Sequence, residues 1–499
     1  MKQSCNVLGK LNCRTRTFAV FVLCATTVIA LPGQTFTTLF SFAGGDGGAP
    51  RAALVQATNG DLYGTSGWGA HGDGTVFKIT PSGTLTTLYN FCAQSGCAGG
   101  AFPTSGLVQA AHGDFYGTTG QGGANGRGTV FKITPGGTLT TLYSFCSQSN
   151  CTDGAFPYAG LVQGVDGDFY GTTGEGGAYG VPYGYGTVFK ITPAGTLTTL
   201  YSFCAQTNCT DGESPNGLVQ AAHGDFYGTT TYGGGNISEG VSSGTVFKIT
   251  PSGTLTTLYS FCSQGGQRCT DGAVPVAGLV QATNGDFYGT THGGGTSRYD
   301  GTVFKIAPGG TLTTLYSFCS QSGCADGQNP GAALVQATDG DFYGTTESGG
   351  TNLYYGTIFK ITPGGMLTTL YSFCSQNACV DGGTPYAGLV QATNGDFYGT
   401  TASEGTDVHY GTAFSLSMGL GPFVKTLPTS GKVGATVKIL GSDLTGATGV
   451  SFNGTAAVFE VVSNSEITAT VPAGAIAGRV QVATPGGTLS SNVPFRVLP

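Results

Sequence analysis

Short runs of apolar and β-branched residues recur along most of the chain, each bounded by Gly, Pro, Asn or Asp, and this pattern predicts β-strands. Four kinds of run follow one another in a fixed order: Leu-Val-Gln, Asp-Phe-Tyr-Gly-Thr-Thr, Gly-Thr-Val-Phe-Lys-Ile and Leu-Thr-Thr-Leu-Tyr-Ser-Phe. The third run or a close variant begins at Gly74, Gly128, Gly186, Gly244, Gly301, Gly356 and Gly411, at intervals of 54 to 58 residues. The chain therefore contains seven copies of a four-stranded unit.

Seven repeats of four strands predict a seven-bladed β-propeller, in which each repeat forms one antiparallel sheet. Both faces of such a blade pack against neighbours, so segment 85–91 need not alternate strictly between apolar and polar residues. Residues 35–42 form an outermost-strand motif, whereas the last repeat ends after Leu416 without one. We therefore predict that the N-terminal strand completes the last blade and closes the ring, which removes an exposed sheet edge.

The repeat and its cysteines end near Gly419, and a different pattern follows. Short alternating runs with Gly and Pro turns between them occupy 436–440, 449–452, 467–471 and 479–482. Such runs predict a small immunoglobulin-like β-sandwich. The chain is thus expected to be all-β, with the propeller at 34–418 and the sandwich at 419–499.

The first 33 residues have the pattern of a secretory signal peptide. Four basic residues precede an apolar run from Phe18 to Leu31, which Pro32 and Gly33 close. This run is shorter than the stretch of about 20 residues that a membrane span needs. We predict that segment 1–33 is removed on export, and that the mature chain is secreted or at the cell surface with no membrane span.

Cysteine usage agrees with export, because the 12 cysteines that follow the signal segment form six close pairs. The pairs are Cys92/Cys97, Cys146/Cys151, Cys204/Cys209, Cys262/Cys269, Cys319/Cys324 and Cys374/Cys379. An even, locally paired set in an exported chain predicts disulfides. Zinc is the alternative, but isolated pairs lack the four ligands of a zinc site.

Composition and charge narrow the classes of function. The chain has 89 glycines, 39% hydrophobic residues and only 9% charged residues, which leaves few side chains for acid–base chemistry. Without the four basic residues of the signal segment the charge is 15 minus 26, or −11, which argues against nucleic acid. No nucleophile elbow, phosphate loop or HExxH motif occurs. We therefore predict no catalytic residues, and the sequence leaves the oligomeric state open.

Variation between the repeats is concentrated in one set of loops, at 66–73, 120–127, 174–185, 231–243, 292–300, 347–355 and 402–410. In a propeller these loops share a face with the disulfide loops. Their aromatic residues, which suit stacking on sugars, are Trp68, Tyr179, Tyr183, Tyr185, Tyr232, Tyr299, Tyr354, Tyr355 and Tyr410. We predict that this variable face binds a glycan or a cell-surface component. The alternatives are drift in unconstrained loops, a purely structural surface protein, and a polysaccharide hydrolase or lyase with paired loop carboxylates.

An Asp-Gly-x-x-Pro motif recurs in the connections between blades. Its aspartates are Asp46, Asp153, Asp211, Asp271, Asp326 and Asp381, and Gly99 replaces the second copy. Six carboxylates at the channel mouth would suit Ca²⁺, which prefers oxygen ligands. The alternative is that each aspartate caps its own turn. Apart from this Ca²⁺, the sequence indicates no cofactor.

The repeat resembles the bacterial tandem-repeat family called GloVer (Gloeo/Verruco repeat) over residues 35–417, through Gly-Leu-Val-Gln, Gly-Asp-Phe-Tyr-Gly-Thr-Thr and Gly-Thr-Val-Phe-Lys-Ile-Thr-Pro. This resemblance implies a surface or secreted location and no established activity. The C-terminal segment resembles an IPT/TIG domain at Val450-Ser451-Phe452 and Thr484-Pro485-Gly486-Gly487, among other positions. In bacterial surface proteins such domains act as spacers or carbohydrate-associated modules.

Overall fold

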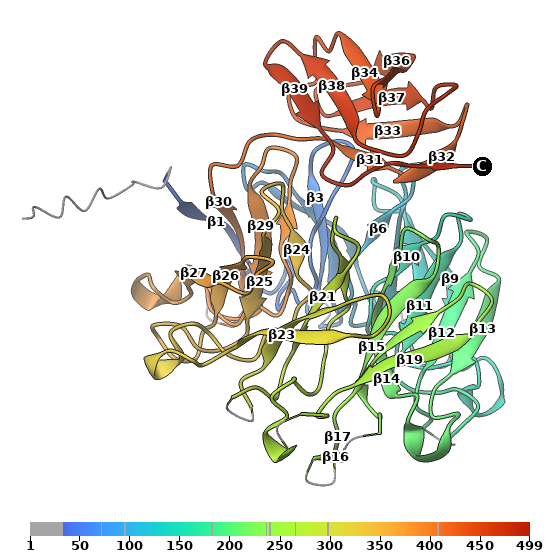
Figure 1. Cartoon of the computed structure of the whole chain (residues 1–499), viewed down its shortest axis with the longest axis vertical. Coiled ribbons are helices and arrows are strands. Elements are labelled where there is room, and N and C mark those ends of the chain that lie inside the picture. Colours follow the sequence, from blue (N-terminus) through green and yellow to red (C-terminus); the bar gives the residue numbers. More distant parts are fainter. Residues whose placement is uncertain are drawn as a thin grey trace, which may run out of the picture.

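The computed structural model describes residues 33–499 except 71, 94–95, 181–182, 236, 239–240, 265, 297–298 and 407–408. All but the last residue of the predicted signal peptide therefore lies outside the described residues. The described chain consists of seven four-stranded antiparallel sheets arranged as propeller blades, followed by a smaller β-sandwich (Figure 1). Within these residues, no helix has the length and apolar character needed to cross a membrane.

Each blade takes its strands in chain order, with one exception in the last. Blade 1 holds β2 (Val55–Gln56), β3 (Leu62–Ser66), β4 (Thr75–Ile79) and β5 (Leu85–Asn90). Blade 2 holds β6 (Val108–Gln109), β7 (Phe115–Thr119), β8 (Thr129–Ile133) and β9 (Leu139–Ser144), and blade 3 holds β10 (Val162–Gln163), β11 (Phe169–Thr173), β12 (Thr187–Ile191) and β13 (Leu197–Ser202). Blade 4 holds β14 (Glu213–Gln220), β15 (Phe226–Tyr232), β18 (Thr245–Ile249) and β19 (Leu255–Ser260), with a hairpin of β16 (Ile237–Ser238) and β17 (Val241–Ser242).

Blade 5 holds β20 (Val280–Gln281), β21 (Phe287–Thr291), β22 (Thr302–Ile306) and β23 (Leu312–Ser317), and blade 6 holds β24 (Val335–Gln336), β25 (Phe342–Thr346), β26 (Thr357–Ile361) and β27 (Leu367–Ser372). Blade 7 holds β28 (Val390–Gln391), β29 (Phe397–Thr401), β30 (Thr412–Ser417) and β1 (Thr35–Ser41). Short 3₁₀ turns occupy η1 (Ser149–Cys151), η2 (Thr207–Cys209), η3 (Gly266–Arg268), η4 (Ser322–Cys324) and η5 (Asn377–Cys379).

The N-terminal strand closes the ring, as the order of the motifs predicts. Strand β1 pairs antiparallel with β30, with Thr35 opposite Ser417 and Ser41 opposite Thr412 (Figure 1). This pairing joins the two ends of the propeller within one sheet, so that the last blade keeps four strands. The six predicted cysteine pairs are also confirmed as disulfides.

Neighbouring blades are joined by aromatic stacking: the tyrosine of the Phe-Tyr motif in one blade stacks on the phenylalanine of the same motif in the next blade. Tyr116 of blade 2 stacks on Phe169 of blade 3 with ring centroids 4.0 Å apart, and both side chains are buried. The same contact recurs at six of the seven junctions. At the seventh junction, Tyr398 packs in one cluster with Leu62, which replaces the phenylalanine in blade 1. Alternate side chains of this strand thus contact two different neighbouring blades, which explains why all five of its residues are buried.

Two polar contacts repeat alongside the stacking. The first threonine of each Gly-Thr-Thr donates to a backbone carbonyl of the next blade, as Thr118 does to Ala159 at 3.0 Å. The glutamine of Leu-Val-Gln joins a blade to the preceding one: Gln220 accepts from the Val165 N–H at 3.1 Å and donates to the Gly224 carbonyl at 2.9 Å. The sequence reasoning treats this glutamine only as part of a strand. Its amide in fact satisfies backbone groups of two blades at once, which strengthens the seam between them.

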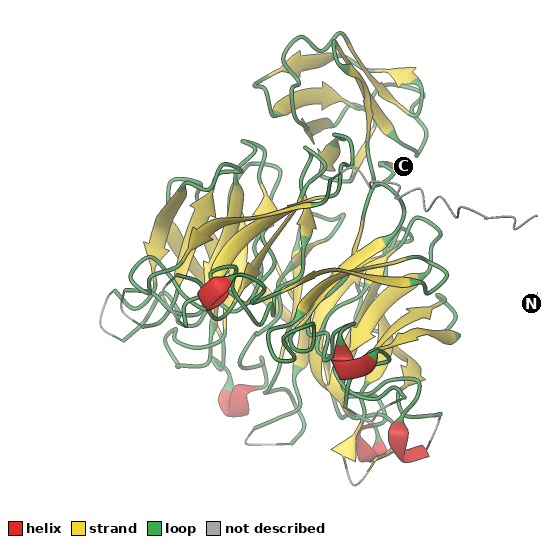
Figure 2. Cartoon of the chain, turned by 90° about the vertical axis from the view of Figure 1, so that its left-hand side faces the viewer, coloured by secondary structure: helices red, strands yellow, loops and turns green. Residues whose placement is uncertain are grey.

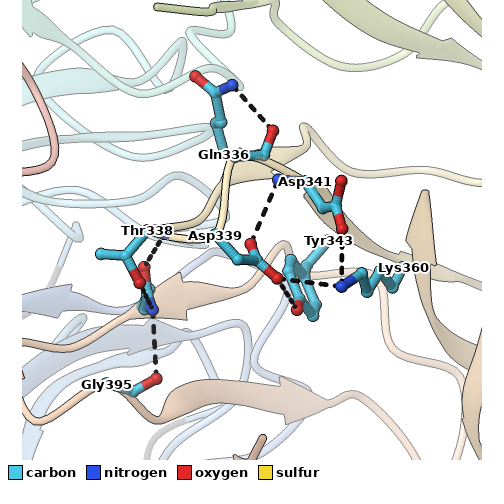
Figure 3. A network of polar contacts seen from close by, with 9 residues as sticks. Gln336, Thr338, Asp339, Asp341, Tyr343, Lys360 and Gly395 are labelled. Carbon is cyan, nitrogen blue, oxygen red and sulfur yellow. Dashed lines mark hydrogen bonds and ion pairs between the residues drawn. The ribbon is translucent and has the colours of Figure 1, made fainter. Parts of the chain in front are cut away.

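The aspartate of Gly-Asp-Phe-Tyr forms an ion pair with the lysine of Gly-Thr-Val-Phe-Lys in blades 1 to 6. In blade 6, Lys360 lies 2.7 Å from Asp341 and 3.0 Å from Asp339, and the Tyr343 hydroxyl donates to Asp339 (Figure 3). Burial, and next the bond to Asp339, raise the pKa of Tyr343. These ion pairs stabilise the hairpin within each blade.

The C-terminal β-sandwich consists of two four-stranded sheets and a short parallel pair. Its strands are β31 (Lys425–Leu427), β32 (Ser430–Lys432), β33 (Thr436–Leu440), β34 (Gly449–Phe452), β35 (Thr455–Ala456), β36 (Phe459–Val461), β37 (Glu466–Thr470), β38 (Val480–Thr484), β39 (Gly487–Ser490) and β40 (Arg496–Leu498). The two sheets enclose one hydrophobic core, as the alternating runs predict.

The sandwich contacts the propeller on opposite sides of the ring. The Phe423 N–H donates to the Thr393 carbonyl of blade 7 at 2.9 Å, and the Ser465 hydroxyl donates to the Thr58 carbonyl of blade 1 at 2.8 Å. Across the ring, the Arg496 guanidinium donates to the Ala222 carbonyl of blade 4. Because blades 1 and 4 are far apart around a ring of seven, these contacts place the sandwich across one end of the central channel.

Candidate ligand site at the channel mouth

The two faces of the propeller differ in what they carry. The sandwich sits on the face of the hairpins that follow Leu-Val-Gln, whereas the disulfide loops with their short 3₁₀ turns lie at the far end (Figure 2). The residues after Gly-Thr-Thr, where the variable loops begin, reach the channel at this far end. The variable face is therefore the end of the channel that the sandwich does not cover.

A cavity of about 460 Å³ opens at this mouth of the channel, and all seven blades contribute to it. Each blade supplies the residue that follows the proline of its inter-blade connection. These residues are Arg51, Thr104, Tyr158, Asn216, Val276, Gly331 and Tyr386. The sequence reasoning missed this ring of post-proline residues. A signal was present: between the constant proline and the constant Leu-Val-Gln, this position differs from blade to blade.

Aromatic and charged side chains are placed around this mouth. The Arg51 guanidinium lies over the Tyr386 ring, 4.8 Å from its centroid, across the junction of blades 1 and 7. Tyr158 of blade 3 is 52% exposed and lies near Glu175. Burial, and next the Glu175 charge, raise the pKa of Tyr158, so its hydroxyl remains a hydrogen-bond donor at neutral pH.

A second hollow of about 430 Å³ adjoins the first and shares Arg51 and Tyr386 with it. It contains an acid–base pair from two blades, in which His292 Nε2 lies 3.5 Å from Glu347 Oε2. The other carboxylate oxygen of Glu347 occupies the space beside Gly331, where an added Cβ would lie 2.0 Å from it. Gly331 therefore makes room for the Glu347 carboxylate.

The predicted aromatic residues are placed in four different ways. Trp68 and Tyr410 meet edge to face, with ring centroids 6.2 Å apart, and both line a shallow hollow at the junction of blades 1 and 7. Tyr232 lines the hollow that holds His292. Tyr185 and Tyr355 pack against hydrophobic cores of the blades. The exposed residues in separate outer loops are Tyr179, Tyr183, Tyr299 and Tyr354.

Cys269 belongs to one of the disulfide loops on the variable face. It forms the predicted disulfide with Cys262, but its own side chain is buried, with only 2% exposed. The Cys269 carbonyl accepts from the Gly272 N–H at 2.8 Å and from the Gly295 N–H at 2.9 Å, so the inter-blade connection and the variable loop both fold against it. The disulfide is confirmed, and Cys269 holds these loops together and offers no surface to a ligand.

The aspartates of the Asp-Gly-x-x-Pro motif are not brought together. Asp326 is fully buried beside the outermost strand of blade 5, where it accepts from the Tyr316 hydroxyl, the Ser320 N–H and hydroxyl, and the Gln321 N–H. Asp153, Asp211, Asp271 and Asp381 make the corresponding contacts in their own loops. Asp46 accepts from the Ala43 N–H. These contacts are those of turn caps.

Potential metal-ligating groups converge in one place within the described part of the chain, at Asp73, Cys92 and Cys97. Both cysteines are bonded to each other there, so their thiolates are not available as ligands. The six aspartates form no such cluster among the described residues, because each carboxylate faces its own loop.

The fold and the site together define a β-propeller with a one-sided channel mouth, joined to an immunoglobulin-like domain. The model of the Gloeobacter/Verrucomicrobia repeat matches residues 26–241 and 239–459, and that of the IPT/TIG domain matches 423–497. The chain therefore belongs to the Gloeobacter/Verrucomicrobia repeat family. No curated protein matches it.

Several solved structures are similar at low identity. A structure described as a gluconolactonase has a TM-score of 0.37 and 11% identity, covering 78% of this chain and 94% of that one. The extracellular domain of a hybrid two-component system from B. thetaiotaomicron has a TM-score of 0.47 and 13% identity, covering 94% of this chain and 55% of that one. A luciferin-regenerating enzyme has a TM-score of 0.41 and 10% identity, covering 78% and 98%. At such scores these likenesses carry no argument about activity.

Proposed function

We propose that this protein is an exported, non-enzymatic glycan-binding protein whose propeller takes its ligand at the channel mouth. One observation carries the proposal: the post-proline position, which differs between most blades, lines the mouth in all seven, whereas the scaffold positions repeat in nearly every blade. A rigid scaffold with variation at one concave site is typical of binding proteins. Tyrosine rings, hydroxyl groups and an amide surround a cavity of about 460 Å³, which suits a sugar.

Three observations support export. The chain begins with a basic and then apolar segment, six disulfides are present, and the family is the Gloeobacter/Verrucomicrobia repeat. Disulfides persist in oxidising compartments outside the cytosol. The sandwich is then a spacer that holds the propeller with its open mouth directed away from it.

Affinity electrophoresis of the mature protein through gels that contain soluble polysaccharides tests this function. We expect retardation by at least one acidic or neutral glycan, and loss of most of it in Tyr158→Ala and Tyr386→Ala. Tyr354→Ala is the matched control, because Tyr354 is 74% exposed in an outer loop. Loss of an aromatic contact worth about 1.4 kcal/mol weakens binding about tenfold. Equal retardation of all three variants, or none for the wild type, would refute the proposal.

A hydrolase or lyase is the second candidate, and the pair of His292 and Glu347 is the observation that favours it. A carboxylate and an imidazole in one hollow are the groups that general acid–base catalysis uses. Release of reducing ends from a bound polysaccharide, abolished by Glu347→Gln but not by Glu404→Gln, would establish this candidate in place of simple binding.

A further inference from the structure

The channel is open at one end and covered at the other. The β-sandwich bonds to blades 7 and 1 through Phe423 and Ser465, and to blade 4 through Arg496. A polymer therefore has no straight path through the propeller. A chain that enters the mouth must end inside it, which limits the site to a terminal unit.

One permanent positive charge faces this mouth among the described residues that line it, and it belongs to Arg51. Within the described chain Arg51 makes no ion pair, whereas Glu347 already lies 3.5 Å from His292. One face of the guanidinium is covered by Tyr386, at 4.8 Å from the ring centroid. This stacking leaves the N–H groups along the guanidinium edge, which match the two oxygens of a carboxylate.

The backbone that carries Arg51 is held in place by the neighbouring blade. The Thr400 hydroxyl of blade 7 donates to the carbonyl of Pro50 at 3.4 Å, and the Ala49 N–H donates to the Tyr410 carbonyl at 2.9 Å. Ring closure therefore positions Arg51, because Thr400 and Tyr410 come from blade 7 and Arg51 from the start of blade 1. A positioned guanidinium loses less entropy when it binds its ligand.

We propose that the channel mouth binds the terminal uronic acid of an acidic glycan end-on, with Arg51 pairing with its carboxylate and the exposed ring of Tyr158 meeting the sugar. This inference rests on the proposed glycan-binding function and adds the ligand's charge and its mode of entry. The acidic net charge of the chain does not favour anions in general, so recognition depends on this one cation.

Isothermal titration with oligogalacturonates of one, three and six units, and with maltotriose as the neutral probe, tests the charge. We expect the trimer of galacturonate to bind at least tenfold more tightly than maltotriose, since a charge-assisted pair contributes about 1.4 kcal/mol or more, a factor of ten. Arg51→Gln should abolish this preference and leave weak binding to both trimers. Arg268→Gln, in an exposed disulfide loop, is the matched control and should keep it.

The stoichiometry tests end-on entry. One protein should bind per oligomer whether it has three or six units, with nearly constant affinity, because only the end enters. Several proteins bound along one long polygalacturonate chain would overturn end-on binding. Equal affinity for galacturonate and maltotriose would overturn the role of Arg51 while leaving glycan binding intact. If the protein binds none of these sugars and no other glycan, both proposals are rejected.

Discussion

The buried aspartate found beside five of the six disulfides offers the sharpest test of how the scaffold is held together. Asp326 accepts from the Tyr316 hydroxyl at 2.8 Å, from the Ser320 N–H and hydroxyl at 2.9 Å each, and from the Gln321 N–H at 3.1 Å. Its side chain is fully buried, so Asp326→Ala leaves these donors without their acceptor.

The size of the effect follows from these contacts. Hydrogen bonds to a charged group contribute about 1.5 kcal/mol or more each, but the loop lies at the surface and water can reach part of the vacated site. We therefore expect Asp326→Ala to lower the free energy of unfolding by about 3 kcal/mol. Urea unfolding of the oxidised protein, followed by tyrosine fluorescence, measures this change as a lower midpoint.

The chain contains its own matched comparison, because Gly99 stands where the other loops have this aspartate. A Cβ added at Gly99 would lie 2.9 Å from the Tyr89 hydroxyl, so this hydroxyl at the end of its side chain must shift in order to donate to the new carboxylate, as the tyrosine hydroxyl does in the other blades. Gly99→Asp should therefore raise the midpoint, in the opposite direction to Asp326→Ala. Unchanged midpoints in both variants would refute the assignment of these aspartates as loop caps.

Three further results are expected. Gly331→Ala should displace the Glu347 carboxylate from His292, since the new Cβ would lie 2.0 Å from its oxygen; urea unfolding should then show a lower midpoint than in the wild type, and an unchanged midpoint would contradict the packing. Tyr288→Ala should cost about 3–5 kcal/mol in urea unfolding, because it deletes a buried stack between blades 5 and 6. Burial lowers the pKa of Lys425 to about 8. An unfolded lysine titrates near 10.4, so between pH 8 and pH 10 the unfolded chain binds more protons at this position than the folded chain. The free energy of unfolding should therefore rise from pH 8 to pH 10 in the wild type, and this rise should be absent in Lys425→Met.

Much of the fold was predictable because the scaffold residues repeat. The Tyr116–Phe169 stack and the Lys360–Asp341 ion pair are each one copy of a contact that recurs around the ring. Repetition of a motif reveals strands and turns. The outermost-strand motif at residues 35–42 precedes the first repeat, and the last repeat lacks this motif, which predicts how the ring closes.

The candidate site was predictable only in its general location. The sequence pointed to the variable face, yet Tyr185 and Tyr355 from those loops pack into blade cores, and the Cys269 side chain is buried. Arg51 and Tyr386 are 335 positions apart in the chain, and only closure of the ring stacks them. Pairing of this kind depends on side-chain positions across a blade junction, which a one-dimensional pattern does not contain.

The sequence by itself determined the seven blades, the closing strand, the disulfides and the second, sandwich domain, because each depends on local periodicity and on turn residues that recur. Only the tertiary structure decided that the sandwich covers one end of the channel and that the post-proline residues converge at the other. The physical reason is that a ring brings one residue from each blade to a common axis, where chemistry depends on distances between segments remote in the chain.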